Sequence, residues 1–141
     1  MEVRAARGAA ELDAALTLRK RVFCGEQGVP LSAERDGRDP EALHVVALEG
    51  GEVIGTCRVL IDGELARLGR MAVAAGARRG GVGRALLDAA ERLSAEAGAR
   101  RMALHSQLAV RDLYAQAGYV PVGEPFVEEG IDHMSMEKRL A

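Results

Sequence analysis

Aromatic residues are scarce in this chain: they make up 3% of its 141 residues, and tryptophan is absent. Hydrophobic residues as a whole still reach an ordinary 48%, so the core must be built from leucine, valine, isoleucine, methionine and alanine. A chain of this length fits one domain that can bury a sizeable core. We therefore expect a single α/β domain over residues 1–141.

Cysteine is rarer still. Cys24 and Cys57 form no disulfide framework, and no Cys-x-x-Cys or Cys/His spacing indicates zinc, so we expect two free thiols and no metal site. The N-terminus has no apolar signal core, and nowhere do about 18 apolar residues run together. These absences favour a cytoplasmic protein that does not enter a membrane.

Charge of either sign is nearly balanced, and the net charge of −2 argues against nucleic-acid binding as a general role. The positions of the charged residues are more informative than the net charge. Between residues 67 and 84 there are five arginines and no acid, whereas between residues 26 and 41 there are five acids and two arginines. The first patch suits a polyanionic ligand and the second suits a cation, and ordinary surface charge is the alternative.

Residues 68–98 organise the chain. Residues 68–73 alternate as a strand does, and from Val82 to Ala97 apolar side chains recur at helical spacing. A strand that enters a helix through glycines directs several free backbone N–H groups at one point, where the helix dipole adds partial positive charge. We therefore predict an anion site, most suited to diphosphate. It comprises Arg78, Arg79, Gly80, Gly81, Val82, Gly83 and Arg84.

Two common phosphate motifs do not fit this turn. The P-loop requires lysine followed by serine or threonine where Arg84 and Ala85 stand, and the dinucleotide fingerprint Gly-x-Gly-x-x-Gly is absent. Arg78-x-x-Gly81-x-Gly83 instead resembles the signature Arg/Gln-x-x-Gly-x-Gly/Ala of the GNAT superfamily of N-acetyltransferases, in which this turn holds the pyrophosphate of acetyl-CoA. For the six residues alone, the alternative is a glycine-rich connection with solvated arginines.

Patterns along the rest of the chain predict an alternation of strands and helices. Strands are expected at 2–7, 44–48, 53–61, 65–73, 101–106, 119–123 and 133–139, and helices at 11–23, 82–98 and 108–117. A long loop with a short helical turn is expected at 24–40, a hairpin turn at 49–52, and a second loop at 124–132. This order predicts a mixed α/β sheet with helices on both faces.

The element order is that of the GNAT fold, and motifs over nearly the whole chain are similar to those of its ElaA/YjcF-type branch. They are Leu18-Arg19-x-x-Val22-Phe23-x-x-Glu26-Gln27-x-x-Pro30, Asp36 and Asp39 before His44, Gly69-Arg70-x-x-Val73, Arg79-Gly80-Gly81-Val82-Gly83, Gln107, Tyr114, Gly118-Tyr119 and Glu129-Gly130-Ile131-x-His133-x-x-Met136. Ser106-Gln107 and Gly118-Tyr119 depart slightly from the usual Ala-Gln and Gly-Phe. The resemblance implies a mostly antiparallel sheet in which the fourth and fifth strands splay apart.

The resemblance also implies where acetyl-CoA, the expected co-substrate, binds. In the family the pantetheine arm lies along the fourth strand with strand-like hydrogen bonds, which assigns it here to Met71, Ala72 and Val73. One N–H of this segment would face the thioester oxygen, and Gln107 would bond the arm. Core packing of Met71 and Val73 is compatible with this assignment, because the assignment concerns their backbone. For Gln107 the alternative is a polar helix start.

Acetyl transfer to an amine requires a neutral nucleophile, a polarised carbonyl and a proton for the leaving thiolate. Tyr114 matches the family's proton-donating tyrosine, and core packing is the alternative. Glu26, His44 and His133 are candidates for the general base, and the pattern does not choose among them. Neither cysteine lies in a motif for an acyl-enzyme, which favours direct transfer in a ternary complex.

Taken together, these motifs predict an acetyl-CoA-dependent N-acetyltransferase that acts on a primary amine of a small molecule or peptide. A module that senses CoA without transfer is the alternative, and a homodimer is left open. The acceptor is expected to be cationic, because acids crowd the loop that borders the acceptor side in the family. These acids are Glu26, Glu34, Asp36, Asp39 and Glu41.

Overall fold

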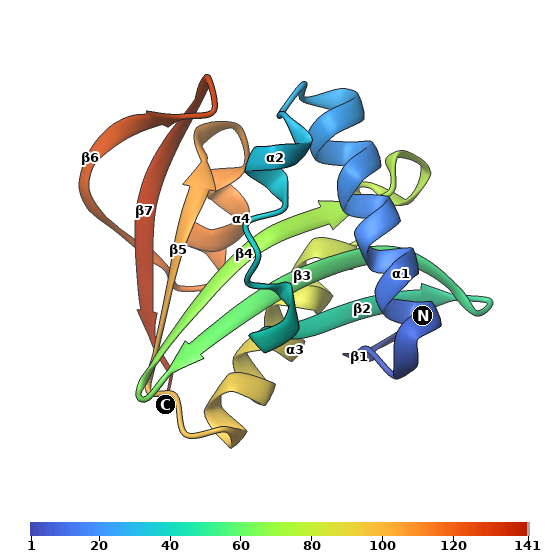
Figure 1. Cartoon of the computed structure of the whole chain (residues 1–141). Coiled ribbons are helices and arrows are strands. Elements are labelled where there is room, and N and C mark those ends of the chain that lie inside the picture. The colour runs from blue at the N-terminus through green and yellow to red at the C-terminus, as the bar shows by residue number, and fades with distance from the viewer. Residues whose placement is uncertain (141) are drawn as a thin grey trace.

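A computed structural model describes residues 1–140 and shows one seven-stranded sheet in the order β1-β2-β3-β4-β5-β7-β6 (Figure 1). The strands are β1 (Glu2–Ala5), β2 (Leu43–Glu49), β3 (Glu52–Asp62), β4 (Leu65–Val73), β5 (Arg101–Gln107), β6 (Val120–Glu128) and β7 (Ile131–Arg139). The α-helices are α1 (Gly8–Arg19), α2 (Leu31–Glu34), α3 (Val82–Glu96) and α4 (Arg111–Gln116). The expected mixed α/β sheet is confirmed.

Helices cover both faces of this sheet, with α1 and α2 on the near face in Figure 1 and α3 and α4 on the far face. The alternation of β2 explains the two layers, because Val45 and Ala47 join the core under α3, whereas Val46 and Leu48 pack under α1. Fully burying each such side chain contributes about 1.5–3 kcal/mol. Within residues 1–140, no helix combines the length and the apolar character needed to cross a membrane.

A glycine on β3 brings the beginning of α3 close to the sheet. A Cβ on Gly55 would lie 2.7 Å from Cγ1 of Val82 and 3.0 Å from Cδ1 of Leu86, which is closer than a side chain tolerates. Val82 and Leu86 are both buried. Gly55 therefore allows the first turns of α3 to pack directly on β3, which fixes the point at which the helix begins.

The sheet splits between β4 and β5. These strands are parallel, and they pair from Leu65↔Arg101 to Leu68↔Leu104 and no further, although β4 continues to Val73 and β5 to Gln107. Beyond this point β5 pairs with β7 on its other side. The expected splay is confirmed, and it leaves one edge of residues 69–73 without a strand partner.

A β-bulge lies where the split begins. Thr56 pairs with Ala72 and Arg58 pairs with Gly69, so β4 has one residue more than β3 between these pairs. Within the bulge, Arg70 has φ of +55°, in the left-handed region that costs a non-glycine residue about 1–3 kcal/mol. Bulges of this kind redirect a strand and are frequent next to active sites.

Two expectations about loops are wrong. Residues 124–128 were expected in a loop and belong to β6, which reaches β7 through a tight turn at Glu129 and Gly130, with φ of +51° and +73°. The helix expected at 11–23 begins earlier, at Gly8, and a π-helical segment, η1 (Lys20–Glu26), extends it into the expected loop. The short helical turn expected within residues 24–40 is present as α2.

Candidate active site

The turn before α3 exposes backbone donors. Gly81 is the N-cap residue with φ of +81°, no side chain caps the helix, and no acid lies in its first turn. The first backbone hydrogen bond of the helix runs from Ala85 N–H to the Gly81 carbonyl. Among residues 1–140, no acceptor is bonded to the N–H groups of Val82, Gly83 and Arg84. Unsatisfied donors and a helix dipole that converge at one point form an anion site.

Glycine keeps this point accessible. A Cβ on Gly81 would contact nothing within 4 Å, but the left-handed backbone there strains any other residue. A Cβ on Gly83 would reach Cδ2 of Leu113 at 3.4 Å, so a side chain there would point toward α4. Arg79 also has positive φ, +67°, and lies exposed beside Gly80.

The arginines of the turn are placed differently from one another. Arg78 donates to the Val73 carbonyl at 3.0 Å and to Glu26 Oε1 at 2.7 Å, so it ties the end of η1 to the end of β4. Arg84 pairs with Asp88 at 3.0 Å, one turn further along α3. Glu26, expected as a candidate base, therefore lies beside the anion turn, and its carboxylate is paired with Arg78.

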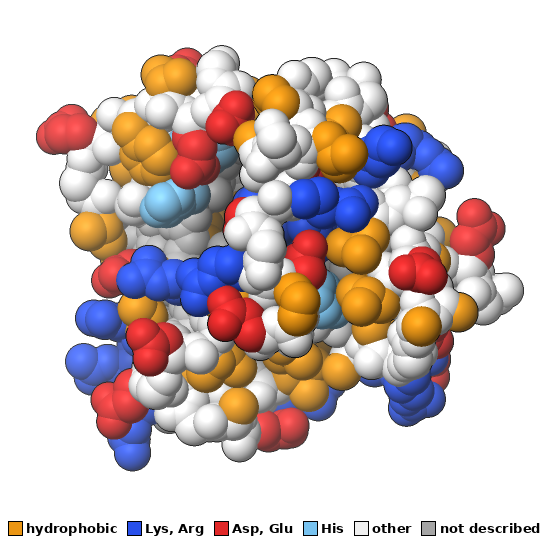
Figure 2. Space-filling view, viewed as in Figure 1, with side chains coloured by type: hydrophobic (Ala, Val, Ile, Leu, Met, Phe, Trp, Pro, Cys, Tyr) orange, Lys and Arg blue, Asp and Glu red, His pale blue; other side chains and the backbone are white. Residues whose placement is uncertain are grey.

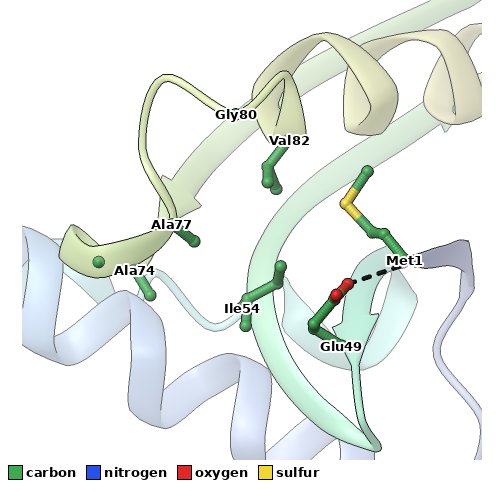
Figure 3. Close-up of a pocket in the computed structure, with 8 residues that line it drawn as sticks. Met1, Glu49, Ile54, Ala74, Ala77, Gly80 and Val82 are labelled. Carbon is green, nitrogen blue, oxygen red and sulfur yellow. Dashed lines mark ion pairs between the residues drawn. The ribbon is translucent and has the colours of Figure 1, made fainter.

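An open hollow of about 570 Å³ adjoins the outer side of this turn. Figure 3 shows Ala77, Gly80 and Val82 along one wall, and Ile54, Glu49 and Met1 along the other. The N-terminal ammonium of Met1 lies 3.3 Å from a carboxylate oxygen of Glu49. The hollow extends the accessible surface around the anion turn toward the β2–β3 hairpin.

Residues 71–73 of β4 have two different edges. On one edge, Ala72 pairs with Thr56 and Val73 pairs with Gly55, whereas β5 has already separated from the other edge. Ala72 packs against α1, and Met71 and Val73 pack against the core under α3. The side chains are therefore used for packing, and the backbone facing the split can pair with an extended ligand as a strand would.

Gln107 lies at the mouth of the split, at the end of β5. Its side-chain amide exchanges hydrogen bonds with that of Gln27, at 3.0 and 3.4 Å between nitrogen and oxygen. This pair bridges the end of η1 to the far side of the split. The predicted ligand-binding residue is thus placed next to the channel along β4.

Tyr114 lies on α4, 4% exposed, with its ring packed edge to face against Tyr119 at 5.9 Å between centroids. Its hydroxyl has no hydrogen-bond partner among the residues that the structure describes. Burial, together with the nearby Cys57, raises the pKa of Tyr114 well above its usual value, so the phenol keeps its proton at neutral pH. The hydroxyl is not among the buried atoms that lack a hydrogen-bond partner, so it can reach a donor or acceptor outside residues 1–140.

His44 lies away from the split. It is paired with Arg58, which in turn pairs with Gly69, so two strand spacings separate it from β4. Its Nε2 contacts the Asp39 carbonyl at 2.9 Å, which holds the loop before β2. Residues 1–140 contain no group of three His, Cys, Asp or Glu side chains placed to hold a metal ion.

The acids of residues 26–41, expected to suit a cation, are not left unpaired, because each of the five contacts an arginine. Arg19, fully buried, contacts Glu34 at 2.7 Å and Asp39 at 2.8 Å. The remaining pairs are Arg58–Asp36, Arg58–Asp39, Arg70–Glu34, Arg70–Asp36, Arg35–Glu34, Arg38–Glu41 and Arg78–Glu26.

These ion pairs set the ionisation of the loop. Hydrogen bonds from Arg58 hold the pKa of Asp36 well below its usual range, against the effect of burial. Burial alone would raise the pKa of Asp39, but hydrogen bonds from Arg19 and Arg58 outweigh it and lower the pKa. Both carboxylates therefore stay charged and internally neutralised.

Arg70 connects this network to the split, and the sequence interpretation missed it. Its guanidinium donates to Glu34 Oε2 at 3.0 Å and to the Glu34 carbonyl at 3.2 Å, which holds the bulge of β4 against α2. A signal for the network was present at Arg19, a charged residue on the helical stripe of Ala15, Leu18 and Val22. For Arg70, sequence alone gives no sign of the positive φ.

Comparison with known proteins agrees with this geometry. The model of the acetyltransferase (GNAT) domain family matches residues 9–140. "Uncharacterized N-acetyltransferase YjcF" of Bacillus subtilis (strain 168) is 32% identical over 129 residues, which cover 91% of this chain and 92% of that protein. The crystal structure of Escherichia coli ElaA is 26% identical, with a TM-score of 0.86, and the alignment covers 98% of this chain and 99% of that one.

A more distant structure contains coenzyme A. An aminoglycoside 6'-N-acetyltransferase complexed with coenzyme A has the same fold, with a TM-score of 0.80 at 16% identity, over 100% of this chain and 98% of that one. The family match extends over almost the whole chain, and it includes the anion turn, the split and Tyr114. The chain therefore belongs to the GNAT acetyltransferase family and is an acyltransferase.

Proposed function

We propose that the protein transfers the acetyl group of acetyl-CoA directly to a primary amine of a small molecule or peptide. The observation that carries the proposal is the uncapped N-terminus of α3 at the open end of the split between β4 and β5. An extended ligand with a diphosphate at one end can use both features at once. Acetyl-CoA has this form.

The positions of the turn and the split suggest how the cofactor would be oriented along β4. The pyrophosphate would bind the N–H groups of residues 82–84, and the arm would run back along residues 73–71 toward the narrow end of the split. The thioester would then lie near Arg70, where the bulge turns the backbone of β4. A backbone N–H of Met71 would stabilise the oxyanion of the tetrahedral intermediate.

The residues around the narrow end can complete the chemistry. A neutral amine attacks the thioester carbonyl, the C–N bond forms, and the C–S bond breaks as the tetrahedral intermediate collapses. Tyr114 supplies the proton for the thiolate, and the attacking nitrogen loses two protons between ammonium and amide. The phenolate of Tyr114 regains one of these two protons, so that one proton has been transferred to CoA and the other is released to solvent.

An acyl-enzyme is disfavoured by both cysteines. Cys57 is 1% exposed, and burial raises the pKa of its thiol to about 12, so it does not supply a thiolate at neutral pH. Cys24 lies on η1 as a free thiol, and it is in no sequence motif for an acyl-enzyme. Direct transfer between two bound substrates therefore fits the chain better than a covalent route.

Thiol release from acetyl-CoA, measured with a panel of primary amines, tests the proposal. The expected result is amine-dependent release with formation of the matching amide. A protein that binds CoA in calorimetry but releases no thiol with any amine would instead be a CoA sensor. The unpartnered hydroxyl of Tyr114 favours the enzyme, because a sensor gains nothing from a proton donor at this position.

A further inference from the structure

Strands β5, β7 and β6 carry a row of side chains on the side of the split away from β4. In the sheet register, Gln107 lies opposite His133, and His133 lies opposite Phe126. Residues directly opposite one another share a face of the sheet, and this is the face on which Gln107 meets Gln27 of the η1 segment. His105, two residues before Gln107, shares the same face. It is the first residue of β5 after the pairing with β4 ends.

A carboxylate completes this cluster. Glu128 approaches His105 Nδ1 at 3.5 Å with Oε1 and His133 Nε2 at 3.7 Å with Oε2. Phe126 stacks on the ring of His133 with 5.8 Å between centroids and meets His105 edge to face at 5.0 Å. On the face that carries α1 and α2, histidine, acidic and hydrophobic side chains gather at the surface over β5, β6 and β7 (Figure 2).

The tautomer of His133 decides what the cluster can bind. Nδ1 lies 2.7 Å from the Ile131 carbonyl, which can only accept, so Nδ1 carries the hydrogen. In the neutral ring Nε2 then presents a lone pair toward Glu128 Oε2, at a distance too long for a direct hydrogen bond. Neither of these two acceptors has a hydrogen-bond donor among residues 1–140, so a ligand that carries a donor can bind between them.

We infer that Glu128, His133 and Phe126 form the acceptor pocket and that its ligand is a primary ammonium on an apolar stem. The inference rests on the proposed function, because it places the amine beside Gln107, next to the split between β4 and β5. An ammonium nitrogen can donate to both Glu128 and His133 Nε2, while the ring of Phe126 covers the adjoining carbons. Glu128 also has no Lys or Arg partner within residues 1–140, unlike the five acids of residues 26–41.

The pocket also supplies the base. His133 Nε2 accepts one proton from the bound ammonium, and the neutral nitrogen then attacks the thioester carbon. The imidazolium that results stays hydrogen-bonded to the Ile131 carbonyl and faces the carboxylate of Glu128, which stabilises its charge. After the amide leaves, the imidazolium returns its proton to solvent. His44 is separated from the split by β3 and β4, whereas His133 is separated from it by β5 alone. Glu26 is paired with Arg78.

Kinetics of matched variants test the assignment. With the best substrate among benzylamine, phenethylamine, agmatine, spermidine and lysine amide, Glu128→Gln should lower kcat/KM for the amine about 10²-fold, mainly through KM. His133→Gln should lower kcat about 10²-fold or more, with an unchanged KM for acetyl-CoA. Glu129→Gln, the same change one position away on an exposed turn, should stay within twofold of wild type. Equal kcat/KM for Glu128→Gln and wild type would overturn the inference.

A binding experiment without acetyl-CoA tests this pocket independently of the proposed acetyl transfer. Methylammonium chloride is titrated into the protein in the absence of acetyl-CoA, with sodium chloride as the ionic-strength control, while NMR follows the histidine Hε1 signals. Saturable shifts of His133 and His105 are expected in wild type and in Glu129→Gln, and their loss is expected in Glu128→Gln. Absence of saturation in wild type would refute the pocket. Saturation without thiol release from any amine would refute the transfer and leave the pocket standing.

Discussion

Two segments concentrate charge near the split, but their charges have opposite roles. The first is residues 26–42, before β2, and the second is residues 74–84, from the end of β4 into the first turn of α3. In the first segment every acid meets an arginine, and the buried Arg19 is held by two carboxylates. In the second segment the N–H groups of residues 82–84 have no acceptor among residues 1–140. The first segment is complete without a ligand, and the second is not.

The difference shows which charges mark a ligand site. Buried polar groups in native proteins are nearly always hydrogen-bonded to one another, whereas helix-end N–H groups without protein partners are free to bond water or a ligand. The arginine network holds α1, α2 and β4 together around Glu34. The turn before α3 and the hydroxyl of Tyr114 belong to the unsatisfied class. Substitutions in the two classes should therefore give opposite readouts.

Tyr114→Phe should give the largest effect on rate with almost none on stability. Phenylalanine keeps the ring and removes a hydroxyl that has no protein partner in the described structure, so the free energy of unfolding should change by less than about 1 kcal/mol. Loss of a general acid should lower the single-turnover rate by about 10²–10⁴-fold, with unchanged affinity for acetyl-CoA.

Tyr119→Phe is the matched control for this prediction. The hydroxyl of Tyr119 donates to Glu91 at 2.8 Å, so its removal should cost about 1 kcal/mol of stability and leave the rate within twofold. Single-turnover measurement is required, because slow product release can hide a slower chemical step. A rate for Tyr114→Phe within twofold of wild type would leave solvent as the proton donor.

Glu34→Gln should have the reverse signature, with a large loss of stability. The side chain of Glu34 is 1% exposed and accepts from Arg19, Arg35 and Arg70. Neutralising it leaves the buried guanidinium of Arg19 undercompensated, which is expected to lower the free energy of unfolding by about 3–5 kcal/mol in urea titrations. Glu41→Gln removes an exposed ion pair with Arg38 instead and should cost less than about 1 kcal/mol. Similar losses in the two variants would contradict the distinction between the two segments.

Gly83→Val and Gly81→Val test the unsatisfied turn. Either side chain would occupy the space over the N–H groups of residues 82–84 and deny them to a pyrophosphate. Calorimetry with CoA should show affinity reduced about 10²-fold, since each hydrogen bond to a charged group is worth about 1.5–3 kcal/mol. The circular dichroism spectrum should be retained. Gly76→Val, where an added Cβ meets nothing and φ is ordinary, should bind CoA normally.

Sequence reasoning found the parts of this structure that are contiguous. Residues 68–98 hold a strand, a glycine turn and a helix in one run, so local patterns predicted these elements correctly, and the anion site between them stays a prediction. The split itself followed from resemblance, because nothing in the pattern of β4 or β5 indicates where their pairing ends. The bulge at Arg70 is likewise set by contacts with α2, which no local pattern reports.

The predictions that were wrong or missing share one physical cause, which is contact between residues far apart in the sequence. Glu124 and Pro125 were predicted in a loop, but β6 is an edge strand, and a register shift between Val122 and Phe126 accommodates the proline. The pairing of the loop acids was not predicted, because their arginine partners come from α1, β3 and β4. Glu128 was not singled out for the same reason, since its neighbours lie on other strands.

Asp36→Asn should give the smallest effect and the sharpest test of the satisfied segment. Arg58 donates to both carboxylate oxygens of Asp36 at 2.8 Å, and these bonds keep its pKa below the unfolded value. A pKa lowered by folding stabilises the native state above the unfolded value of about 3.9, and that contribution is lost as pH falls below it. Asparagine cannot ionise, so the variant should be less stable by about 1–2 kcal/mol at pH 7, and this gap should narrow between about pH 4 and pH 2. Asp88→Asn, which breaks an exposed pair with Arg84, should differ from wild type by less than about 0.5 kcal/mol throughout. A gap for Asp36→Asn that stays constant down to pH 3 in urea titrations would show that Arg58 is held by packing and not by this carboxylate.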